Sequence, residues 1–155
     1  MKLYLVQHGK AVDKKTDPDR PLSVEGAQEV RTIGSFFAKR PLSVEQVWHS
    51  GKTRARQTAE LLAKAAGPNA DLVMREGLSP DDEVKPVARE LSKRNADLMI
   101  VGHLPWLSKL AGLLLTGQDG AGPIAFTYAS VVCLERSGDD AWHVKWIIIP
   151  ELVSG

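Results

Sequence analysis

Residues 3–10 of the chain, LYLVQHGK, form a short apolar run that ends at a histidine followed by a glycine. Such a run is typical of a buried strand, and its carboxyl end delivers His8 into a turn. Residues 98–105, LMIVGHLP, repeat the pattern far downstream and place His103 at the end of a second strand. Ligands of open α/β sheets bind outside the carboxyl ends of the strands. We therefore expect the two imidazoles to meet at one edge of one sheet.

The length and composition of the chain fit one globular domain. The chain has 155 residues, of which 43% are hydrophobic and 25% charged, so we expect a single domain over residues 1–155 with one substantial core. Its formal net charge of +1 argues against a strongly basic nucleic-acid-binding protein. Lys and Arg outnumber Asp and Glu among residues 1–60, which suits an anionic substrate and, equally well, an ordinary solvated surface.

The cysteine content and the apolar runs indicate where the protein works. Cys133 is the single cysteine, so an internal disulfide and a cysteine cluster for zinc are both excluded. Because it lies in an apolar run, we expect a buried, unreactive thiol. The N-terminal apolar run is too short for a signal peptide, and no apolar stretch approaches the length of a membrane span. We therefore expect a cytoplasmic protein that does not enter a membrane.

Strand and helix patterns alternate over most of the chain, which is typical of a parallel sheet with helices on both faces. The end of the chain differs, because the turn signal at residues 136–140 joins two strand patterns, 126–135 and 142–149, into a hairpin. We therefore expect an α/β fold: a three-layer α/β/α sandwich whose mostly parallel sheet has an antiparallel edge and a C-terminal hairpin. The parallel strands are expected at the opening run and at residues 44–49, 71–74 and 97–101.

The expected helices carry signals at their first residues. Ser23 and Thr53 each stand before a helical apolar pattern and are expected to cap it. Pro86 is expected in the first turn of the third helix, because proline deeper inside would break it. Pro105 occupies the expected first position of the fourth helix.

Several residue types suited to phosphoryl transfer follow the expected strands. Arg54 lies in the first turn of the helix after the second strand, and the loop 77–82 follows the third strand. Two imidazoles, a guanidinium and helix N-terminal amides together describe a phosphoryl-transfer pocket. Arginine binds phosphate oxygens bidentately, an imidazole can attack phosphorus, and a carboxylic acid can protonate the leaving group. The carboxylates near this loop are Glu76, Asp81 and Asp82.

Each of these residues also has a purely structural interpretation. A histidine at a strand end is often a structural residue, and Arg54 alone fits a solvated helix position. Asp81 and Asp82 fit a helix cap. His49 also ends a strand and either lines the site or faces solvent, whereas His143 in the hairpin is expected to be structural. Only the joint arrangement favours a functional site.

Four stretches of the chain, in order, resemble motifs of the histidine phosphatase superfamily, whose fold is phosphoglycerate mutase-like. The overall pattern is most similar to the small SixA-type phosphohistidine phosphatases, and the resemblance covers nearly the whole chain. Beyond the opening strand with its His-Gly pair, the matching stretches are residues 20–26 (RPLSVEG), 49–59 (HSGKTRARQTA), 78–80 (LSP) and 101–105 (VGHLP).

The resemblance implies a role for each matching residue. His8 would be the phosphorylated nucleophile, while Arg54 and His103 would bind the phosphoryl group. The proton donor is left open among Glu76, Asp81 and Asp82. No metal and no cofactor is implied. Further substrate contacts are expected from neighbouring residues, namely Gln7, Gly9, Lys10, Ser50, Lys52 and Leu104.

Position 7 departs from the family pattern, which has arginine before the nucleophilic histidine. Gln7 can donate hydrogen bonds to phosphate oxygens but offers no charged, bidentate fork. Losing one such contact can cost on the order of 10²–10³ in rate. Lys10 and Lys52 are close in sequence to the expected site and are the candidates to supply the missing charge.

Two functions follow from this pattern. The first is a phosphatase that acts through phospho-His8 on a phosphorylated protein, such as a phosphohistidine domain, or on a small phosphoester. The lack of large insertions indicates an open site, which suits a protein-borne phosphohistidine. The second is a degenerate, non-catalytic module that binds phosphoryl groups, and Gln7 favours it. A mutase is disfavoured because the chain has no room for a lid over its substrate.

Overall fold

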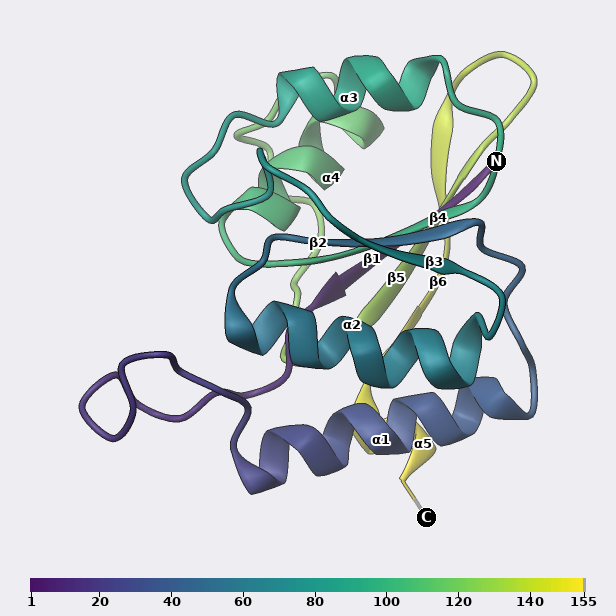
Figure 1. Cartoon of the computed structure of the whole chain (residues 1–155). Helices are drawn as coiled ribbons and strands as arrows, with labels where there is room; N and C mark the ends of the chain where they lie inside the picture. The colour runs from purple at the N-terminus through teal and green to yellow at the C-terminus, as the bar shows by residue number, and fades with distance from the viewer. Residues whose placement is uncertain (155) are drawn as a thin grey trace.

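The structure, a computed structural model, describes residues 1–154 and contains one six-stranded sheet (Figure 1). Its strands are β1 (Lys2–Gln7), β2 (Gln46–His49), β3 (Asp71–Met74), β4 (Leu98–Gly102), β5 (Val131–Arg136) and β6 (Trp142–Ile148). The order across the sheet is β3-β2-β4-β1-β5-β6. Neighbours from β3 to β1 pair in parallel, whereas β5 pairs antiparallel with both β1 and β6. The predicted mostly parallel sheet with an antiparallel hairpin edge is therefore confirmed.

Helices cover both faces of this sheet, as predicted (Figure 1). They are α1 (Val24–Ala38), α2 (Thr53–Ala66), α3 (Lys85–Ser92), α4 (Trp106–Thr116) and α5 (Pro150–Val153). α3 and α4 pack on the face that carries Leu3 and Leu5, while α1 and α2 pack on the face that carries Tyr4 and Val6. β1 is therefore buried on both sides, which explains why its sequence is apolar without alternation. Over residues 1–154, no helix combines the length and apolar character needed to cross a bilayer.

The predicted helix starts are partly correct. Ser23 caps α1, because its hydroxyl oxygen accepts a hydrogen bond from the Gly26 amide at 2.9 Å. Pro86 lies in the first turn of α3, as expected. The prediction for Thr53 is wrong: it is the first residue of α2, and Lys52 precedes it as an N-cap without a side-chain hydrogen bond. α4 begins at Trp106, so that Pro105 stands one position before the expected one.

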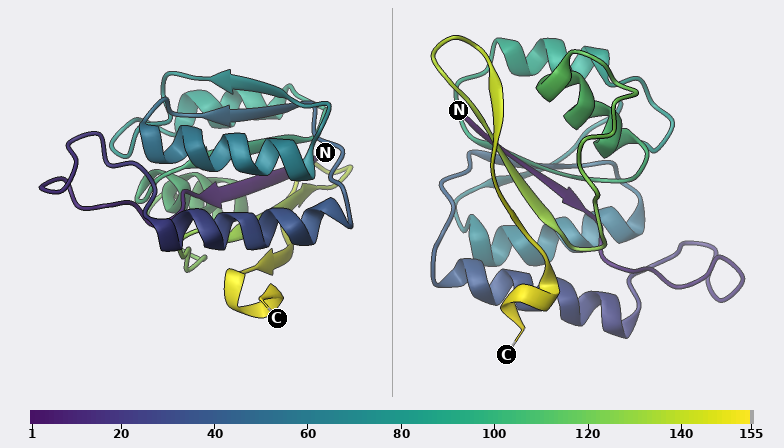
Figure 2. Two further views of the ribbon diagram at one scale, coloured as in Figure 1. Left: turned by 60° about the horizontal axis from the view of Figure 1, so that its bottom comes forward. Right: turned by 180° about the vertical axis from the view of Figure 1, so that it is seen from behind.

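The C-terminal part differs from the prediction at two places. Residues 126–130 were expected to be strand, but β5 begins at Val131 and is preceded by a turn closed by a hydrogen bond from the Ser130 amide to the Thr127 carbonyl at 3.0 Å. Ala129 in this turn has a φ of 60°, a left-handed conformation that a strand does not contain. The short helix α5, which was not predicted, contacts α1 near the C-terminus of the chain (Figure 2).

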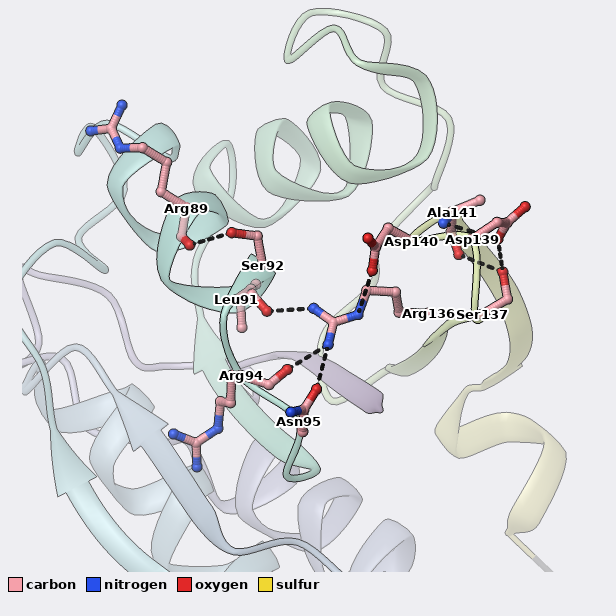
Figure 3. A network of polar contacts seen from close by, with 10 residues as sticks. All are labelled: Arg89, Leu91, Ser92, Arg94, Asn95, Arg136, Ser137, Asp139, Asp140 and Ala141. Carbon is pink, nitrogen blue, oxygen red and sulfur yellow. Dashed lines mark hydrogen bonds and ion pairs between the residues drawn. The ribbon is translucent and has the colours of Figure 1, made fainter.

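Arg136 at the end of β5 fastens the hairpin to the C-terminal end of α3 (Figure 3). Its guanidinium donates hydrogen bonds to the carbonyls of Leu91 and Arg94, each at 2.6 Å, and to the Asn95 side chain at 3.2 Å. The last carbonyls of a helix have no partner within the helix. A cation at this end also interacts favourably with the helix dipole. Arg136, although distant in sequence, therefore caps the carbonyl groups at the C-terminal end of α3.

The topology creates a crevice at the carboxyl ends of β1 and β4. These strands are neighbours, yet the chain leaves β1 toward α1 on one face and leaves β4 toward α4 on the other. Such a divergence is a topological switch point, where ligands of α/β sheets bind. His8 and His103 directly follow the two strands, and the His8 amide donates a hydrogen bond to the Gly102 carbonyl at 3.1 Å.

Candidate active site

His8 is held in one orientation and in its neutral form. Its Nδ1 lies 2.7 Å from the Gly9 carbonyl oxygen. Because a carbonyl only accepts, Nδ1 carries the proton and donates, which leaves Nε2 with a free lone pair. Burial, with smaller contributions from the charges of Arg54 and Arg20, lowers the pKa of His8 to about 4 against the opposing effect of the Gly9 hydrogen bond. The ring is therefore unprotonated at neutral pH, and its Nε2 lone pair is available.

His103 lies beside His8, with the two ring centroids 5.0 Å apart. Its Nε2 is 2.6 Å from the Ser50 hydroxyl oxygen, and its buried Nδ1 has no hydrogen-bond partner among the described residues. Burial lowers the pKa of His103 to about 3, with smaller contributions from neighbouring cations and His8. A phosphoryl dianion in this crevice would raise that pKa and favour the donating imidazolium.

Arg54 reaches the site from the first turn of α2. Its Nε is buried without a hydrogen-bond partner among residues 1–154. Burial lowers its pKa, and the charge of Arg20 lowers it further. Thr58 Oγ1 donates a hydrogen bond to the Arg54 carbonyl at 2.8 Å and accepts one from the Gly9 amide at 3.0 Å. Thr58 thereby links the helix that carries the guanidinium to the turn that carries the nucleophile.

Gln7 and Gly9 flank the nucleophile in different ways. Gln7 is 7% exposed, and its Oε1 is buried without a hydrogen-bond partner in the described part of the chain. A Cβ on Gly9 would lie 2.8 Å from Val30 Cγ2 and 3.0 Å from the Gly26 carbonyl oxygen. Only glycine at position 9 therefore lets the start of α1 pack against the strand end. Gln7 contributes no positive charge to this buried position.

Two neighbours of the histidines were not identified as site residues from the sequence. Tyr128 lies in the turn before β5, and its ring centroid is 5.7 Å from that of His8. This turn is held to β1 by a hydrogen bond from the Ala129 amide to the Gln7 carbonyl at 3.0 Å. The second is Arg20, whose charge lowers the pKa values of both histidines and of Arg54. It belongs to a stretch that matches a family motif, but no local pattern indicates that its charge reaches the histidines.

The lysines and the leucine expected at the site lie on its rim. The Lys10 amine is 3.2 Å from a Glu25 carboxylate oxygen, in an exposed pair. Lys52 is exposed at the start of α2, and its charge contributes to lowering the pKa of His103. Leu104 is 40% exposed directly after His103. These exposed side chains are accessible to a molecule that approaches from solvent, unlike the buried His8 and His103.

The predicted proton donors are not brought into hydrogen-bonding contact with the histidines. Glu76 and Asp82 line a cavity of about 240 Å³ at the start of α3, and Asp81 is exposed nearby. The Asp82 carboxylate accepts a hydrogen bond from the Ser79 amide at 2.9 Å, within its own loop. The charged side chains that shift the pKa values of His8 and His103 are all cationic. A carboxylate as general acid stays a prediction.

The remaining chemically active side chains have structural surroundings. His49 is buried, and its Nδ1 accepts a hydrogen bond from the Gly51 amide at 3.1 Å, while His143 is exposed on β6. Cys133 is buried as predicted, and burial raises the pKa of its thiol to about 11. In residues 1–154, no three His, Cys, Asp or Glu side chains are grouped as ligands of a metal ion would be.

Comparison with known proteins identifies relatives that share most of this chain. The sequence pattern of the histidine phosphatase superfamily (branch 1) matches residues 3–79. An uncharacterized protein of Picosynechococcus sp. strain PCC 7002 is 34% identical over 128 residues, which cover 77% of this chain and 76% of that protein. The phosphohistidine phosphatase SixA of Escherichia coli K12 is 28% identical over 97% of this chain and 94% of its own length.

Solved structures extend the likeness to the whole fold. The structure of the protein histidine phosphatase SixA complexed with tungstate superimposes with a TM-score of 0.86, at 23% sequence identity. The match covers 99% of this chain and 100% of that chain, so it includes the second histidine, which the matched family pattern does not reach. The chain therefore belongs to the histidine phosphatase superfamily, branch 1, and is similar to its SixA-type members.

Proposed function

We propose that the chain is a phosphatase that hydrolyses protein phosphohistidine through a phosphorylated His8. The observation that carries the proposal is the 2.7 Å hydrogen bond from His8 Nδ1 to the Gly9 carbonyl. It fixes the tautomer in which Nε2 has the lone pair, on a ring whose centroid lies 5.0 Å from that of His103. Burial keeps this ring neutral at physiological pH, so no separate base is needed to activate it.

The proposed reaction has two steps. In the first, the Nε2 lone pair of His8 attacks phosphorus and the bond from phosphorus to the substrate nitrogen breaks. The electron pair of that bond leaves on a substrate imidazole that carries a proton on its other nitrogen and so departs neutral. Arg54 and His103 donate hydrogen bonds to the phosphoryl oxygens as their charge changes. In the second step, water attacks phosphorus, the bond to Nε2 breaks, one proton of the water stays on the departing inorganic phosphate, and the other passes to solvent. The Nε2 lone pair is restored for the next turnover.

The cationic surroundings of the histidines support a phosphohistidine substrate over an alkyl phosphate. An imidazole is a far weaker base than an alkoxide, so it leaves phosphorus with less help from a strong acid. The groups whose charges reach His8 are Arg54 and Arg20, which bind oxygens but do not protonate a leaving group at neutral pH. The similarity to SixA of Escherichia coli, a phosphohistidine phosphatase, supports the same substrate class.

One assay separates this proposal from its alternative. The protein and its His8→Ala variant are incubated with a phosphohistidine peptide and with para-nitrophenyl phosphate, and released phosphate is measured. We expect release from the peptide by the wild type and none above background by the variant. Release that survives His8→Ala would refute the covalent mechanism. Trapping of acid-labile, base-stable phosphate on the wild-type chain would show the intermediate directly.

A non-catalytic phosphoryl-binding module is the second candidate, and Gln7 is the observation that favours it. The family arginine at this position is replaced by a neutral side chain that is 7% exposed and has an unpartnered oxygen. If the wild type binds inorganic phosphate by calorimetry but releases none from either substrate, the module is the correct function.

A further inference from the structure

The position directly before His8 carries no positive charge, whereas the family pattern that the sequence resembles has arginine there. Gln7 occupies that position, at the buried end of β1. A phosphoryl group brings close to two negative charges, and neutral donors bind its oxygens about half as strongly as charged ones. A second arginine near Arg54 would help to offset the negative charge of a phosphoryl group. Arg20 is such a residue, because its charge acts on Arg54.

The loop from residue 12 to residue 21 returns Arg20 to the strand end that carries His8. Its two ends are joined by a hydrogen bond from the Val12 amide to the Pro21 carbonyl at 2.9 Å and by a bridge between Ala11 and Leu22. The tip of the loop projects into solvent (Figures 1 and 2). Arg20 directly precedes Pro21 and therefore belongs to the base of the loop.

The same base is fastened to the helix that carries Arg54. The Leu22 amide donates a hydrogen bond to Gln57 Oε1 at 2.8 Å. Arg54 and Gln57 are three residues apart in α2 and therefore lie on one face of the helix. The loop is thus held on the helix face from which the Arg54 guanidinium extends.

The Arg20 side chain is partly buried and oriented by its own loop. Its Nε donates a hydrogen bond to the Val12 carbonyl at 3.3 Å, which leaves the two terminal nitrogens as donors for another group. Its backbone has a φ of 47°, a left-handed conformation that is costly for arginine and is kept by the anchored loop ends. Arg20 and Arg54 form no salt bridge with any carboxylate in the part of the chain that the structure describes.

Two neighbouring arginines without carboxylate partners repel one another, and an anion between them relieves that repulsion. The charge of Arg20 acts on His8, Arg54 and His103 together, so it is focused on the crevice. We propose that Arg20 binds the phosphoryl group together with Arg54 and supplies the positive charge that position 7 lacks. This inference rests on the proposed function, because it assigns a residue to the same phosphoryl site.

The two lysines expected to compensate are less well placed. Lys10 is paired with Glu25, so its charge is already offset. Lys52 is exposed, and of the two histidines its charge affects only His103. Lys10→Ala and Lys52→Ala therefore serve as the competing variants.

Calorimetry with inorganic phosphate tests the proposal without relying on turnover. The proteins are the wild type, Arg20→Gln, Arg20→Lys, Gln7→Arg, the double variant Gln7→Arg/Arg20→Gln, and the two lysine variants. Arg31→Gln removes an exposed arginine on α1 and is the matched control for net charge. Thermal unfolding of each protein confirms that it is folded, and kcat/KM for para-nitrophenyl phosphate is measured alongside.

We expect Arg20→Gln to weaken phosphate binding about tenfold or more, Arg20→Lys to retain part of the affinity, and Arg31→Gln to leave it unchanged. In the Gln7→Arg background the same Arg20→Gln change should cost less than about threefold, because an arginine at position 7 takes over the contact. Unchanged affinity in Arg20→Gln, equal losses in both backgrounds, or a larger loss in either lysine variant would overturn the proposal. If Arg20→Gln loses affinity as expected while the wild type hydrolyses neither substrate, the proposed function fails and the role of Arg20 stands.

Discussion

The imidazole rings of His8 and His103 lie 5.0 Å apart and are inclined at 52°, although the two residues are far apart in the sequence. Two imidazoles can share one buried crevice because neither carries a charge there. Burial is the largest cause of the lowered pKa in both, which is about 4 for His8 and about 3 for His103. The site is therefore set to accept a negative charge from its substrate.

The pH dependence of the reaction should follow from the pKa of His8. The nucleophile must be unprotonated, and the pH profile of kcat/KM reports the free enzyme. A lowered pKa extends the neutral form toward acid, so we expect kcat/KM to fall only as the pH approaches about 4, well below the ordinary range of histidine. The measurement is kcat/KM for an aryl phosphate from pH 3.5 to 8, corrected for ionisation of the substrate. An acid limb near pH 6.5 would contradict the burial of His8.

Tyr128 should influence the same profile, because its ring covers His8 at a centroid distance of 5.7 Å. Removing the ring in Tyr128→Ala exposes the imidazole and weakens the main cause of its lowered pKa. We expect the acid limb of kcat/KM to move toward higher pH in Tyr128→Ala. Tyr128→Phe keeps the ring and is the control, so its acid limb should match the wild type. A shift of equal size in both variants would assign the effect to the hydroxyl instead.

Gly26→Ala should damage the site from the start of α1. A Cβ at this position would overlap the Lys10 carbonyl oxygen, so the backbone that follows His8 must move. Alanine normally stabilises a helix by roughly 0.5–1 kcal/mol relative to glycine, yet here we expect both the free energy of unfolding and kcat to fall. Urea denaturation and steady-state kinetics measure the two effects. Gly120→Ala is the control, because no atom lies within 4 Å of the added carbon.

Arg136 should contribute to stability without contributing to catalysis. Arg136→Ala removes two hydrogen bonds of 2.6 Å to the last carbonyls around α3 and leaves these groups without a partner. We expect the free energy of unfolding to fall by about 2–4 kcal/mol, while kcat stays unchanged. Lys145→Ala removes a half-exposed pair with Glu135 at 3.5 Å and should cost at most about 1 kcal/mol. Equal costs in the two variants would show that Arg136 acts only as a surface charge.

Local patterns in the sequence were sufficient to predict most of the fold. The uninterrupted apolar run of β1 predicts a strand buried on both faces, and Ser23 predicts the start of α1. Both depend on neighbouring residues alone. The order β3-β2-β4-β1-β5-β6 does not follow from any single stretch, because it is decided by how the helices cover both faces of the sheet.

The site was predictable only where a strand end determines it. His8 and His103 follow strands, so the fold itself brings them together. Tyr128 reaches His8 through a hydrogen bond between Ala129 and Gln7, segments that are distant in sequence, and this pairing has no local signal. Glu76 and Asp81 are candidate proton donors because of their chemistry and loop position. Both are exposed, and neither forms a hydrogen bond with His8 or His103.

The hydrogen bond that closes the base of the loop 12–21 has a consequence for how the sequence of this protein can vary. Because the Val12 amide and the Pro21 carbonyl fasten both ends, the exposed residues between them can be lengthened, shortened or exchanged without displacing the nucleophile. Substitutions confined to these exposed residues can therefore change which substrates the protein recognises. For the same reason, a recognition peptide can be inserted at the tip of this loop while the position of His8 is kept.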